Sequence, residues 1–349
     1  MKIKKLNILL SVFVAFLSLS AFFYKDEPKY FRIPKNWPQP VYDFKNNPTT
    51  ILGFELGKEL FYDPILSADS TISCTSCHLS YTAFSHTDHK LSHGINGSIG
   101  TRNSSSLVNL AWNTSFMWDG GVNNLEVQAI NPITNPVEMN SKLTDVIFKL
   151  NRSSKYKKLF HEVYKDSIIN SQRLFKSLAQ FTGNLVSYNS RYDSVMRKEK
   201  EFTAQEKNGY ALFQKNCGSC HKEPLFTNQQ FENNGLPLDT ALKDYGRMKI
   251  TLNAKDSLRF KVPTLRNIEF SYPYMHDGRF KNLSQVLKHY TSGIQQSKTL
   301  SKPLDAPIVL SSNEKVDLTA FLLTLTDRSF LFNEDFKYNP NNLSNKPKD

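Results

Sequence analysis

Apolar residues recur at helical spacing in two parts of the chain, residues 174–185 and residues 318–325. Apolar positions three or four residues apart form one face of an α-helix. No convincing run alternates between apolar and polar residues, as a half-buried strand would. The sequence therefore predicts a mainly α protein. The two apolar faces consist of Leu174, Leu178, Phe181 and Leu185, and of Leu318, Phe321, Leu322 and Leu325.

Two capping boxes mark the starts of helical segments. Thr203 is followed three positions later by Glu206, and Ser311 is followed in the same way by Glu314. In such a pair each side chain satisfies a backbone N–H group at the start of the helix. The first box predicts a helix that leads to Cys217, and the second predicts the helix near the C-terminus.

The N-terminus has the pattern of a secretory signal. Met1–Lys5 is basic, and Leu6–Phe23 is apolar and uncharged. A basic start, an apolar stretch and a small-residue cleavage site, here before Ala21, are typical of exported proteins. The apolar stretch is also near the lower limit for a spanning helix. Residues 1–23 are therefore predicted to be a cleaved signal peptide or a retained anchor, and the rest of the chain is expected to work in the periplasm.

Composition divides the remaining chain. Residues 24–48 are rich in Pro, Asn and Lys, which predicts an extended arm that crosses a surface. The charged connector at residues 198–202 (KEKEF) separates two compact units, residues 49–200 and residues 201–335. Residues 336–349 form a polar tail.

One short pattern occurs in both compact units: a helix with Gly and Leu-Phe, followed by Cys-x-x-Cys-His. The equivalent first cysteines are 143 residues apart (217 minus 74). One type of domain is therefore used twice. The two copies are Gly57, Leu60, Phe61, Cys74, Cys77 and His78, and Gly209, Leu212, Phe213, Cys217, Cys220 and His221.

Cys-x-x-Cys-His is the attachment motif of a c-type haem. The two cysteines form thioethers with the haem vinyl groups, and the histidine becomes the proximal iron ligand. A zinc site would place its second cysteine pair about 15–20 residues away, and a redox dithiol does not need the histidine. The motifs use all four cysteines of the chain. The sequence therefore predicts two cytochrome c-like domains, each with one covalently attached haem.

The chain is basic, with 44 Lys and Arg against 32 Asp and Glu and a formal net charge of +12. Such a balance indicates an anionic partner. Two haem motifs and an export signal argue against nucleic acid as that partner. The basic surface is instead expected to steer a small, acidic electron-donor protein.

These motifs and several others resemble those of the di-haem bacterial cytochrome c peroxidases and their MauG-like relatives. The resemblance covers about residues 45–330. It implies that the haem of residues 49–200 reacts with peroxide and that the haem of residues 201–335 transfers electrons. The further motifs that carry it are Thr101-Arg102-Asn103, Leu107-Val108-Asn109, Trp118-Asp119-Gly120, Gln128, Pro132, Pro136-Val137-Glu138-Met139, residues 262–267 (VPTLRN) and residues 272–278 (YPYMHDG).

The resemblance gives catalytic roles to three residues. Glu138 matches the glutamate that moves a proton during O–O cleavage, and Gln128 matches its companion near the bound peroxide. Trp118 matches the tryptophan between the two haems. Taken alone, Glu138 would be interpreted as a solvated loop carboxylate and Trp118 as core packing. The ordered spacing of the three residues favours the catalytic interpretation.

The sequence allows two interpretations of the sixth ligand position of the first haem. His93 matches the histidine that caps the peroxide-reacting haem in resting peroxidases and that MauG-like members lack. The alternative is a surface histidine on a loop flanked by glycine. His86 and His89 lie nearby in the sequence and are expected to be solvated.

The second haem shows the main departure from the peroxidases. Their methionine ligand is replaced by Tyr290, which is similar to the MauG ligand pattern. A phenolate ligand favours ferric iron and lowers the reduction potential relative to a thioether. His289 and Met275 compete for this position, and a core tyrosine bonded elsewhere is the remaining alternative.

The resemblance also implies a calcium ion between the haems. Asn103, Ser271 and Pro273 match its ligand positions, and oxygen ligands suit calcium. Ser271 stands where the family has threonine, which matters little if its carbonyl is the ligand. His276 is a supporting residue near the boundary between the haems.

The sequence therefore predicts a periplasmic di-haem peroxidase that reduces hydrogen peroxide to water. Its electrons would come from a small cytochrome or cupredoxin, and a homodimer is one expected assembly. One alternative is a MauG-like enzyme that oxidises residues of a protein substrate, for which Tyr290 argues. Another is an electron-transfer cytochrome without peroxide chemistry, in which Glu138 and Gln128 would have no task.

Overall fold

The computed structural model describes residues 31–338. The expected signal or anchor at residues 1–23 and the tail from residue 339 onward lie outside the described residues. Within residues 31–338, no helix is both long enough and apolar enough to cross a membrane.

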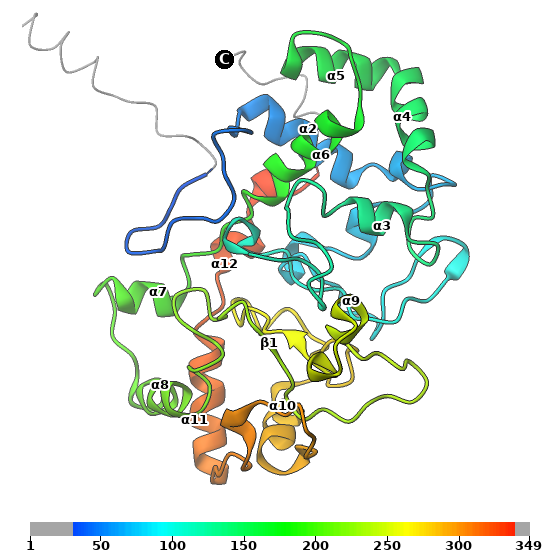
Figure 1. Cartoon of the computed structure of the whole chain (residues 1–349). Helices are drawn as coiled ribbons and strands as arrows, with labels where there is room; N and C mark the ends of the chain where they lie inside the picture. The colour runs from blue at the N-terminus through cyan, green and yellow to red at the C-terminus, as the bar shows by residue number, and fades with distance from the viewer. Residues whose placement is uncertain (1–30, 339–349) are drawn as a thin grey trace, which may run out of the picture.

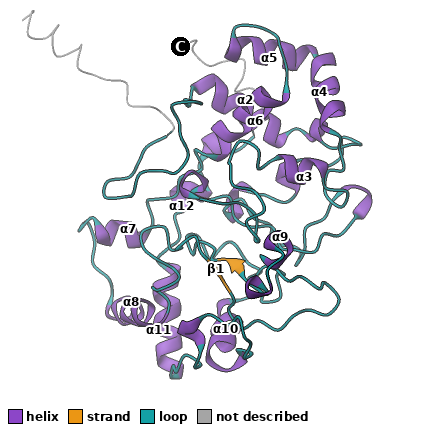
Figure 2. Ribbon diagram, viewed as in Figure 1, coloured by secondary structure: helices purple, strands orange, loops and turns teal. Residues whose placement is uncertain are grey.

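The molecule is built from helices joined by long loops (Figures 1 and 2). In the described part of the chain, the strands are β1 (Phe231–Glu232) and β2 (Phe260–Lys261), which pair antiparallel. The prediction of a mainly α protein is confirmed. The helices are α2 (Ile51–Tyr62), α3 (Ile130–Thr134), α4 (Leu143–Arg152), α5 (Ser154–Tyr164), α6 (Ser171–Thr182), α7 (Arg191–Met196), α8 (Ala204–Asn216), α9 (Met248–Thr251), α10 (Leu283–Lys288), α11 (Ser312–Leu323) and α12 (Arg328–Leu331).

Two hydrophobic cores follow each other along the chain. The first is built mainly from residues 54–185 around α2 and α6, and the second from residues 192–325 around α8 and α11. Figure 1 shows the first helix pair in the upper half of the molecule and the second in the lower half. The C-terminal segment returns to the first core, because Phe330, Leu331 and Phe336 are buried there.

Each core contains the same close helix crossing. A Cβ on Gly57 of α2 would lie 2.0 Å from the carbonyl oxygen of Ser177 on α6. A Cβ on Gly209 of α8 would lie 2.0 Å from the carbonyl oxygen of Asp317 on α11. No side chain fits at either position, so the glycine of the repeated pattern is required by the approach of the second helix.

The phenylalanines of the repeat occupy equivalent positions in the two cores. The rings of Phe61 and Phe181 lie 5.1 Å apart between centroids, and those of Phe213 and Phe321 lie 5.0 Å apart. Each pair joins the two helices of its crossing through a buried aromatic contact. The repeated sequence pattern therefore corresponds to a repeated helix pair.

Both predicted capping boxes are present. Thr203 and Glu206 cap the start of α8, and Ser311 and Glu314 cap the start of α11. In each box the hydroxyl accepts from the backbone of the glutamate, whose side chain accepts from the backbone N–H of the capping residue. The cap before α8 sets where this helix begins, and the helix then leads directly to Cys217.

The apolar faces extend beyond the helices that they predict. Leu185 lies after the end of α6 and Leu325 after the end of α11, yet both are fully buried. The spacing therefore predicts burial correctly and overstates the length of both helices.

The described part of the arm, residues 31–48, contains neither helix nor strand. Trp37 packs edge-on against Trp112, with ring centroids 5.2 Å apart, and lies under the guanidinium of Arg266 at 4.6 Å. Trp112 belongs to the N-terminal half and Arg266 to the C-terminal half, so the arm contacts both.

Candidate functional site

The first haem-attachment motif lies at a small cavity lined by Cys74, Cys77 and His78. The Nδ1 atom of His78 lies 2.7 Å from the carbonyl oxygen of Phe84. A proton on Nδ1 donates to this oxygen and leaves Nε2 with a free lone pair. Burial lowers the pKa of His78 to about 4, which keeps the imidazole neutral. His78 is therefore prepared to bind a metal through Nε2.

The structure brings Gln128 and Glu138 to this same cavity. The short helix α3 separates them in sequence and positions one before and one after it. The Oε1 atom of Glu138 accepts a hydrogen bond of 2.9 Å from Asn135. Burial raises the pKa of Glu138 above its usual value, and this hydrogen bond acts in the opposite direction. The site therefore contains a carboxylate with increased proton affinity.

His93 also lines this cavity. Its loop is packed tightly on the Glu138 segment, because a Cβ on Gly94 would lie 2.5 Å from the carbonyl oxygen of Glu138. The backbone N–H of Ile95 donates to that oxygen at 2.8 Å. This packing keeps the His93 loop beside the carboxylate.

His86 and His89 are arranged differently from the expected pair of solvated side chains. His89 is exposed and His86 is half-buried. The ring of His89 stacks on both other rings, with centroids 5.0 Å from His86 and 4.1 Å from His93. The three histidines therefore form a stack that ends at the cavity.

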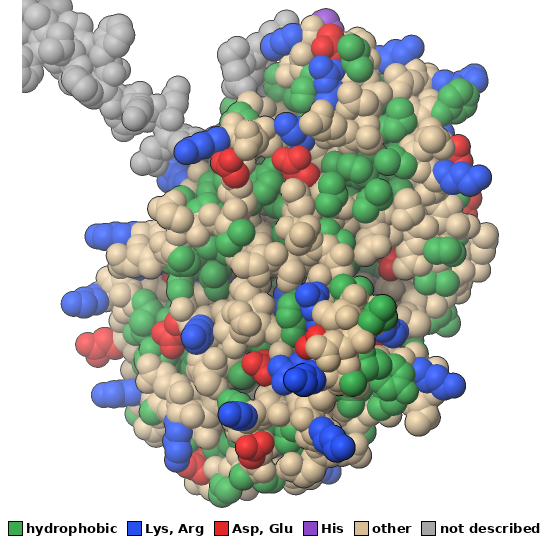
Figure 3. All heavy atoms as spheres, viewed as in Figure 1, with side chains coloured by type: hydrophobic (Ala, Val, Ile, Leu, Met, Phe, Trp, Pro, Cys, Tyr) green, Lys and Arg blue, Asp and Glu red, His purple; other side chains and the backbone are tan. Residues whose placement is uncertain are grey.

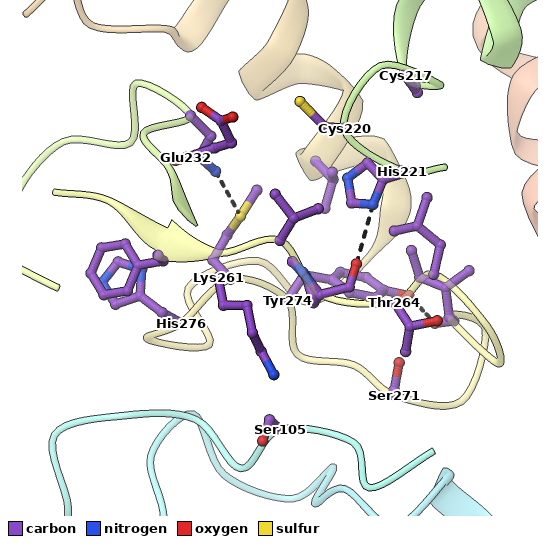
Figure 4. A pocket seen from close by; sticks show the side chains of 18 of the residues that line it. Ser105, Cys217, Cys220, His221, Glu232, Lys261, Thr264, Ser271, Tyr274 and His276 are labelled. Atoms are coloured by element: carbon purple, nitrogen blue, oxygen red, sulfur yellow. Dashed lines mark hydrogen bonds between the residues drawn. The ribbon is translucent and has the colours of Figure 1, made fainter. Parts of the chain in front are cut away.

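The second haem-attachment motif lies at a larger cavity of about 280 Å³, lined by Cys217, Cys220 and His221 (Figure 4). The Nδ1 atom of His221 lies 3.1 Å from the carbonyl oxygen of Phe226 and 3.2 Å from that of Pro263. Burial lowers the pKa of His221. As at the first site, these contacts leave Nε2 of a neutral imidazole for a metal.

Two of the three candidate ligands of the second haem line this cavity, namely Tyr290 and Met275. The sulfur of Met275 accepts a hydrogen bond of 3.4 Å from Asn234. His289 is not among the lining residues, and its Nε2 lies 3.0 Å from the carbonyl oxygen of Asn234. Tyr290 belongs to a π-helical turn after α10, a distortion frequent at functional sites.

Tyr290 is a phenol rather than a phenolate in the protein alone. Burial raises its pKa to about 12, although a hydrogen bond with Asn234 acts in the opposite direction. Ligation through oxygen would therefore require a metal cation that displaces the proton.

Trp118 lines the larger cavity, while Gln128 lines both cavities. The indole Nε1 of Trp118 donates to the carbonyl oxygen of Asn103 at 2.9 Å, which fixes the ring. The predicted catalytic residues therefore extend from one cavity to the other.

The three predicted calcium positions, Asn103, Ser271 and Pro273, all line the larger cavity. Asn103 is buried, and its side-chain nitrogen donates to the carbonyl oxygen of Lys90 at 3.0 Å. Within residues 31–338, no group of three or more His, Cys, Asp or Glu is arranged to hold a metal ion. A calcium ion here would depend on amide and backbone oxygens.

An ion-pair cluster joins the two halves beside Trp118. Arg102 donates to Asp119 at 2.6 Å and to Asp244 at 2.6 Å. Burial alone would raise the pKa of Asp244, but the hydrogen bonds and charge of Arg102 bring it well below its usual range. Nearby, His276 stacks on Phe260, and burial lowers its pKa to about 4.

Lys261 lines the larger cavity and belongs to none of the motifs that the sequence presents. Its local signal is a lysine that stands between two apolar residues, Phe260 and Val262. The partners of this lysine depend on distant segments, so its environment required the structure.

Both cavities have the chemistry that a c-type haem requires. Each presents two cysteines as thioether donors and one neutral histidine with a free Nε2. The walls of the larger cavity are mainly apolar, as suits a porphyrin ring, and include Leu283, Leu287 and Leu318. The residues present therefore fit two covalently bound haems.

Comparisons with known proteins agree with this chemistry. Residues 52–201 match the family described as di-haem cytochrome c peroxidase. The chain is 36% identical over 307 residues to the methylamine utilization protein MauG of Methylorubrum extorquens, covering 84% of this chain and 83% of the relative. It is 35% identical over 278 residues to the cytochrome c551 peroxidase of Nitrosomonas europaea, covering 78% and 79%.

A solved structure has the same fold. It is the crystal structure of a MauG-like protein associated with microbial copper homeostasis, with a TM-score of 0.79 and 28% identity. The match covers 90% of this chain and 99% of that chain. The protein therefore belongs to the di-haem cytochrome c peroxidase and MauG family, and carries two covalently attached haem c groups.

Proposed function

We propose that the protein is a periplasmic di-haem peroxidase that reduces hydrogen peroxide to water with electrons from a small donor protein. The observation that carries the proposal is the position of Glu138 and Gln128 on the same cavity as His78. A cytochrome that only transfers electrons does not need a half-buried carboxylate there. Peroxidases among the similar proteins support the same conclusion.

The haem groups supply the iron redox chemistry that peroxide reduction requires. Glu138 supplies the proton transfer. Asn135 holds its Oε1 atom, so Oε2 takes the proton from one peroxide oxygen and returns it to the other. The raised pKa of Glu138 suits a group that must both accept and release a proton. The amide of Gln128 orients the peroxide beside this carboxylate.

Trp118 has the position of an electron relay. It lines the larger cavity together with Gln128, which also lines the smaller one. The hydrogen bond to Asn103 holds the indole in one orientation. An aromatic ring fixed at this place shortens the distance that an electron must cross between the two cavities.

The remaining ligands are also proposals. His93 would hold the iron of the first haem in the resting protein, and Tyr290 would hold the iron of the second haem. Asn103 and the backbone of Ser271 and Pro273 would hold a calcium ion between the two haems. Each assignment is supported by the place of these residues on the cavity walls.

The electron donor is proposed to be acidic, because the chain carries a net charge of +12. On the face shown in Figure 3, Lys and Arg side chains are spread among acidic and apolar ones rather than gathered in one patch. Donor docking on such a surface should weaken as ionic strength rises. The homodimer stays a prediction.

The test is steady-state reduction of hydrogen peroxide by a small reduced cytochrome. We expect turnover that saturates with donor and that falls by orders of magnitude in Glu138→Gln. Unchanged turnover in this variant, with both haems bound, would remove the proposed mechanism.

A second candidate is a MauG-like enzyme that oxidises a protein substrate. Tyr290 on the wall of the larger cavity and the 36% identity to a MauG protein favour it. An oxidised spectrum that persists after peroxide is added without donor would support this candidate. Rapid return to the resting spectrum only when donor is added would support the peroxidase.

A further inference from the structure

The larger cavity contains a half-buried cation without a carboxylate partner. Lys261 of β2 is the one Lys or Arg among the residues that line this cavity. Its Nζ donates to the carbonyl oxygen of Ser115 at 2.8 Å and lies 5.9 Å from the centre of the Phe116 ring. In the part of the chain that the structure describes, no ion pair joins it. Burial lowers the pKa of Lys261 to about 8.

Two other cations of this protein, Arg266 and Arg102, are neutralised by carboxylates. Arg266 is fully buried and binds Asp193 with two hydrogen bonds of 2.8 and 2.9 Å. Arg102 binds Asp244 in the same two-pronged way at 2.6 and 2.9 Å. A buried charge without a counter-ion is unfavourable. Lys261 therefore lacks the anion that these other cations have.

The protein part of the cavity does not supply this anion. The one carboxylate among the lining residues is Glu232, and the hydroxyl of Ser301 donates to it. Figure 4 shows the carboxylate of Glu232 and the ammonium end of Lys261 on opposite sides of the cavity. The counter-ion must therefore come from the group that fills the cavity.

Haem has an anionic edge in the required place. Its two propionates lie on the edge opposite the two vinyl groups, which the cysteines bind. Figure 4 shows Cys217 and Cys220 on one side of the cavity, His221 below them, and the ammonium end of Lys261 on the far side, toward Ser105. A haem attached at the cysteines would therefore extend its propionate edge toward Lys261.

We propose that the Lys261 ammonium binds a propionate of the haem held by Cys217 and Cys220, and that its charge raises the reduction potential of this haem. A nearby positive charge stabilises the reduced iron, which carries one positive charge less. Lys261 is thus a positioning residue. The proposal rests on haem attachment, which family membership establishes, and does not depend on the proposed peroxidase activity.

The same lysine links this haem to the N-terminal half. Its backbone N–H donates to the carbonyl oxygen of Trp118 at 2.8 Å, and its ammonium donates to Ser115. Trp118 and the Lys261 charge are therefore held together at the boundary between the two halves. The residue that tunes the second haem also orients the segment that carries the proposed relay.

The test compares three variants of the full-length holoprotein: Lys261→Met, Lys261→Gln and Lys261→Arg. Glutamine keeps an N–H donor for the Ser115 carbonyl and loses the charge, whereas arginine keeps the charge. Lys281→Met is the matched control, because Lys281 is exposed and does not line the cavity. The readouts are haem content per chain and the midpoint potential of each haem in a spectroelectrochemical titration.

We expect the Met and Gln variants to lower the midpoint potential of the second haem, and the Arg variant and the Lys281 control to stay close to the wild type. A purely structural lysine predicts instead that Gln behaves like the wild type, and this result would overturn the proposal. If Met and Gln lose the second haem, retention in Arg supports the proposal and loss in Arg contradicts it. Unchanged potentials in the Met and Gln variants would overturn this proposal, whatever their peroxide turnover. Unchanged turnover in Glu138→Gln would overturn only the peroxidase mechanism, so the two failures are distinguishable.

Discussion

The two haem-attachment regions are alike on the side of the proximal histidine and differ on the opposite side. At both sites a glycine allows a second helix to pack directly against the first. A backbone carbonyl oxygen also accepts a hydrogen bond from Nδ1 of the histidine. The carbonyl belongs to Phe84 at the first site and to Phe226 at the second. Both residues adopt left-handed backbone conformations, with φ of 54° and 55°. The two sites therefore share an unusual backbone angle as well as the contact to the histidine.

The other side of each cavity has diverged. The first presents Glu138 and Gln128, which can move a proton and orient a small polar molecule. The second presents Tyr290, the sulfur of Met275 and the Lys261 ammonium, which can bind iron or adjust its potential. The same scaffold therefore serves both haem sites, and the residues on the opposite side distinguish the proposed peroxide site from the proposed electron-transfer site. Substitutions on the two sides should therefore have different consequences.

The largest difference should come from Glu138→Gln. We expect a decrease in peroxide turnover of roughly 10²–10⁴-fold, because the amide cannot accept the proton. Turnover is measured with a reduced cytochrome, and haem content is checked in the same preparation. Glu201→Gln, an exposed carboxylate on the connector, is the control and should behave like the wild type. A small decrease would mean that the first cavity has no proton-transfer group at Glu138.

The pH dependence should sharpen this assignment. Burial raises the pKa of Glu138, so the fraction of ionised base falls at a higher pH than for an ordinary glutamate. Turnover should therefore decline on acidification through this raised pKa and recover as the pH rises. The acid limb is measured from kcat/KM against pH. Glu138→Gln should remove this limb, and a limb that persists in the variant would assign it to another group.

Alanine in place of the crossing glycines tests the shared scaffold. At Gly57 and at Gly209 the added Cβ would meet a backbone oxygen at 2.0 Å, so the helices must separate. We expect each substitution to lower the free energy of unfolding by about 1–3 kcal/mol. Thermal unfolding of the holoprotein measures the loss. Gly97 has open space around it but a φ of 68°, so Gly97→Asn, which tolerates this conformation, is the control. Equal stability of wild type and both alanine variants would contradict the duplicated crossing.

Local sequence was sufficient for the shared side. The capping boxes of α8 and α11 and the haem motifs are each contained in a few neighbouring residues, so their meaning does not depend on the rest of the fold. The repeated Gly and Leu-Phe pattern is local as well. Its glycine allows a second helix to approach closely, and its phenylalanine packs against that helix. These features were predicted because short-range patterns determine them.

The side of each cavity opposite the proximal histidine depends on contacts between segments that are distant in the sequence. Lys261 meets Ser115 across 146 positions, and Arg102 meets Asp244 across 142. Neither pairing has a local signal. The sequence predicts that residue 336 begins a polar tail, yet Phe336 is buried in the first core. In each case long-range packing decides the environment of the side chain, which is why the sequence alone could not predict it.

The ligand of the second haem gives a smaller, spectroscopic difference. If Tyr290 binds iron, Tyr290→Phe should change the oxidised absorption spectrum of the second haem and leave that of the first unchanged. The potential of the second haem should rise, because the anionic ligand is lost. Met275→Leu is the matched comparison, since its sulfur lines the same cavity. A changed spectrum only in Met275→Leu would give the position to methionine and weaken the MauG-like candidate.

The smallest effect should come from the proposed cap of the first haem. His93 sits at the inner end of the histidine stack, and its loop is held on Glu138 by the contact at Gly94. Because the backbone of Gly94 and Ile95 makes these contacts, His93→Ala should remove the imidazole without moving the loop. A cap predicts an altered resting spectrum of the first haem and faster reaction with the first peroxide added. His89→Ala shortens the stack without removing His93 and is the control. An unaltered resting spectrum in His93→Ala would leave the first haem without this ligand. The two regions would then differ more sharply, with one cavity open to peroxide at rest and the other closed by its own side chain.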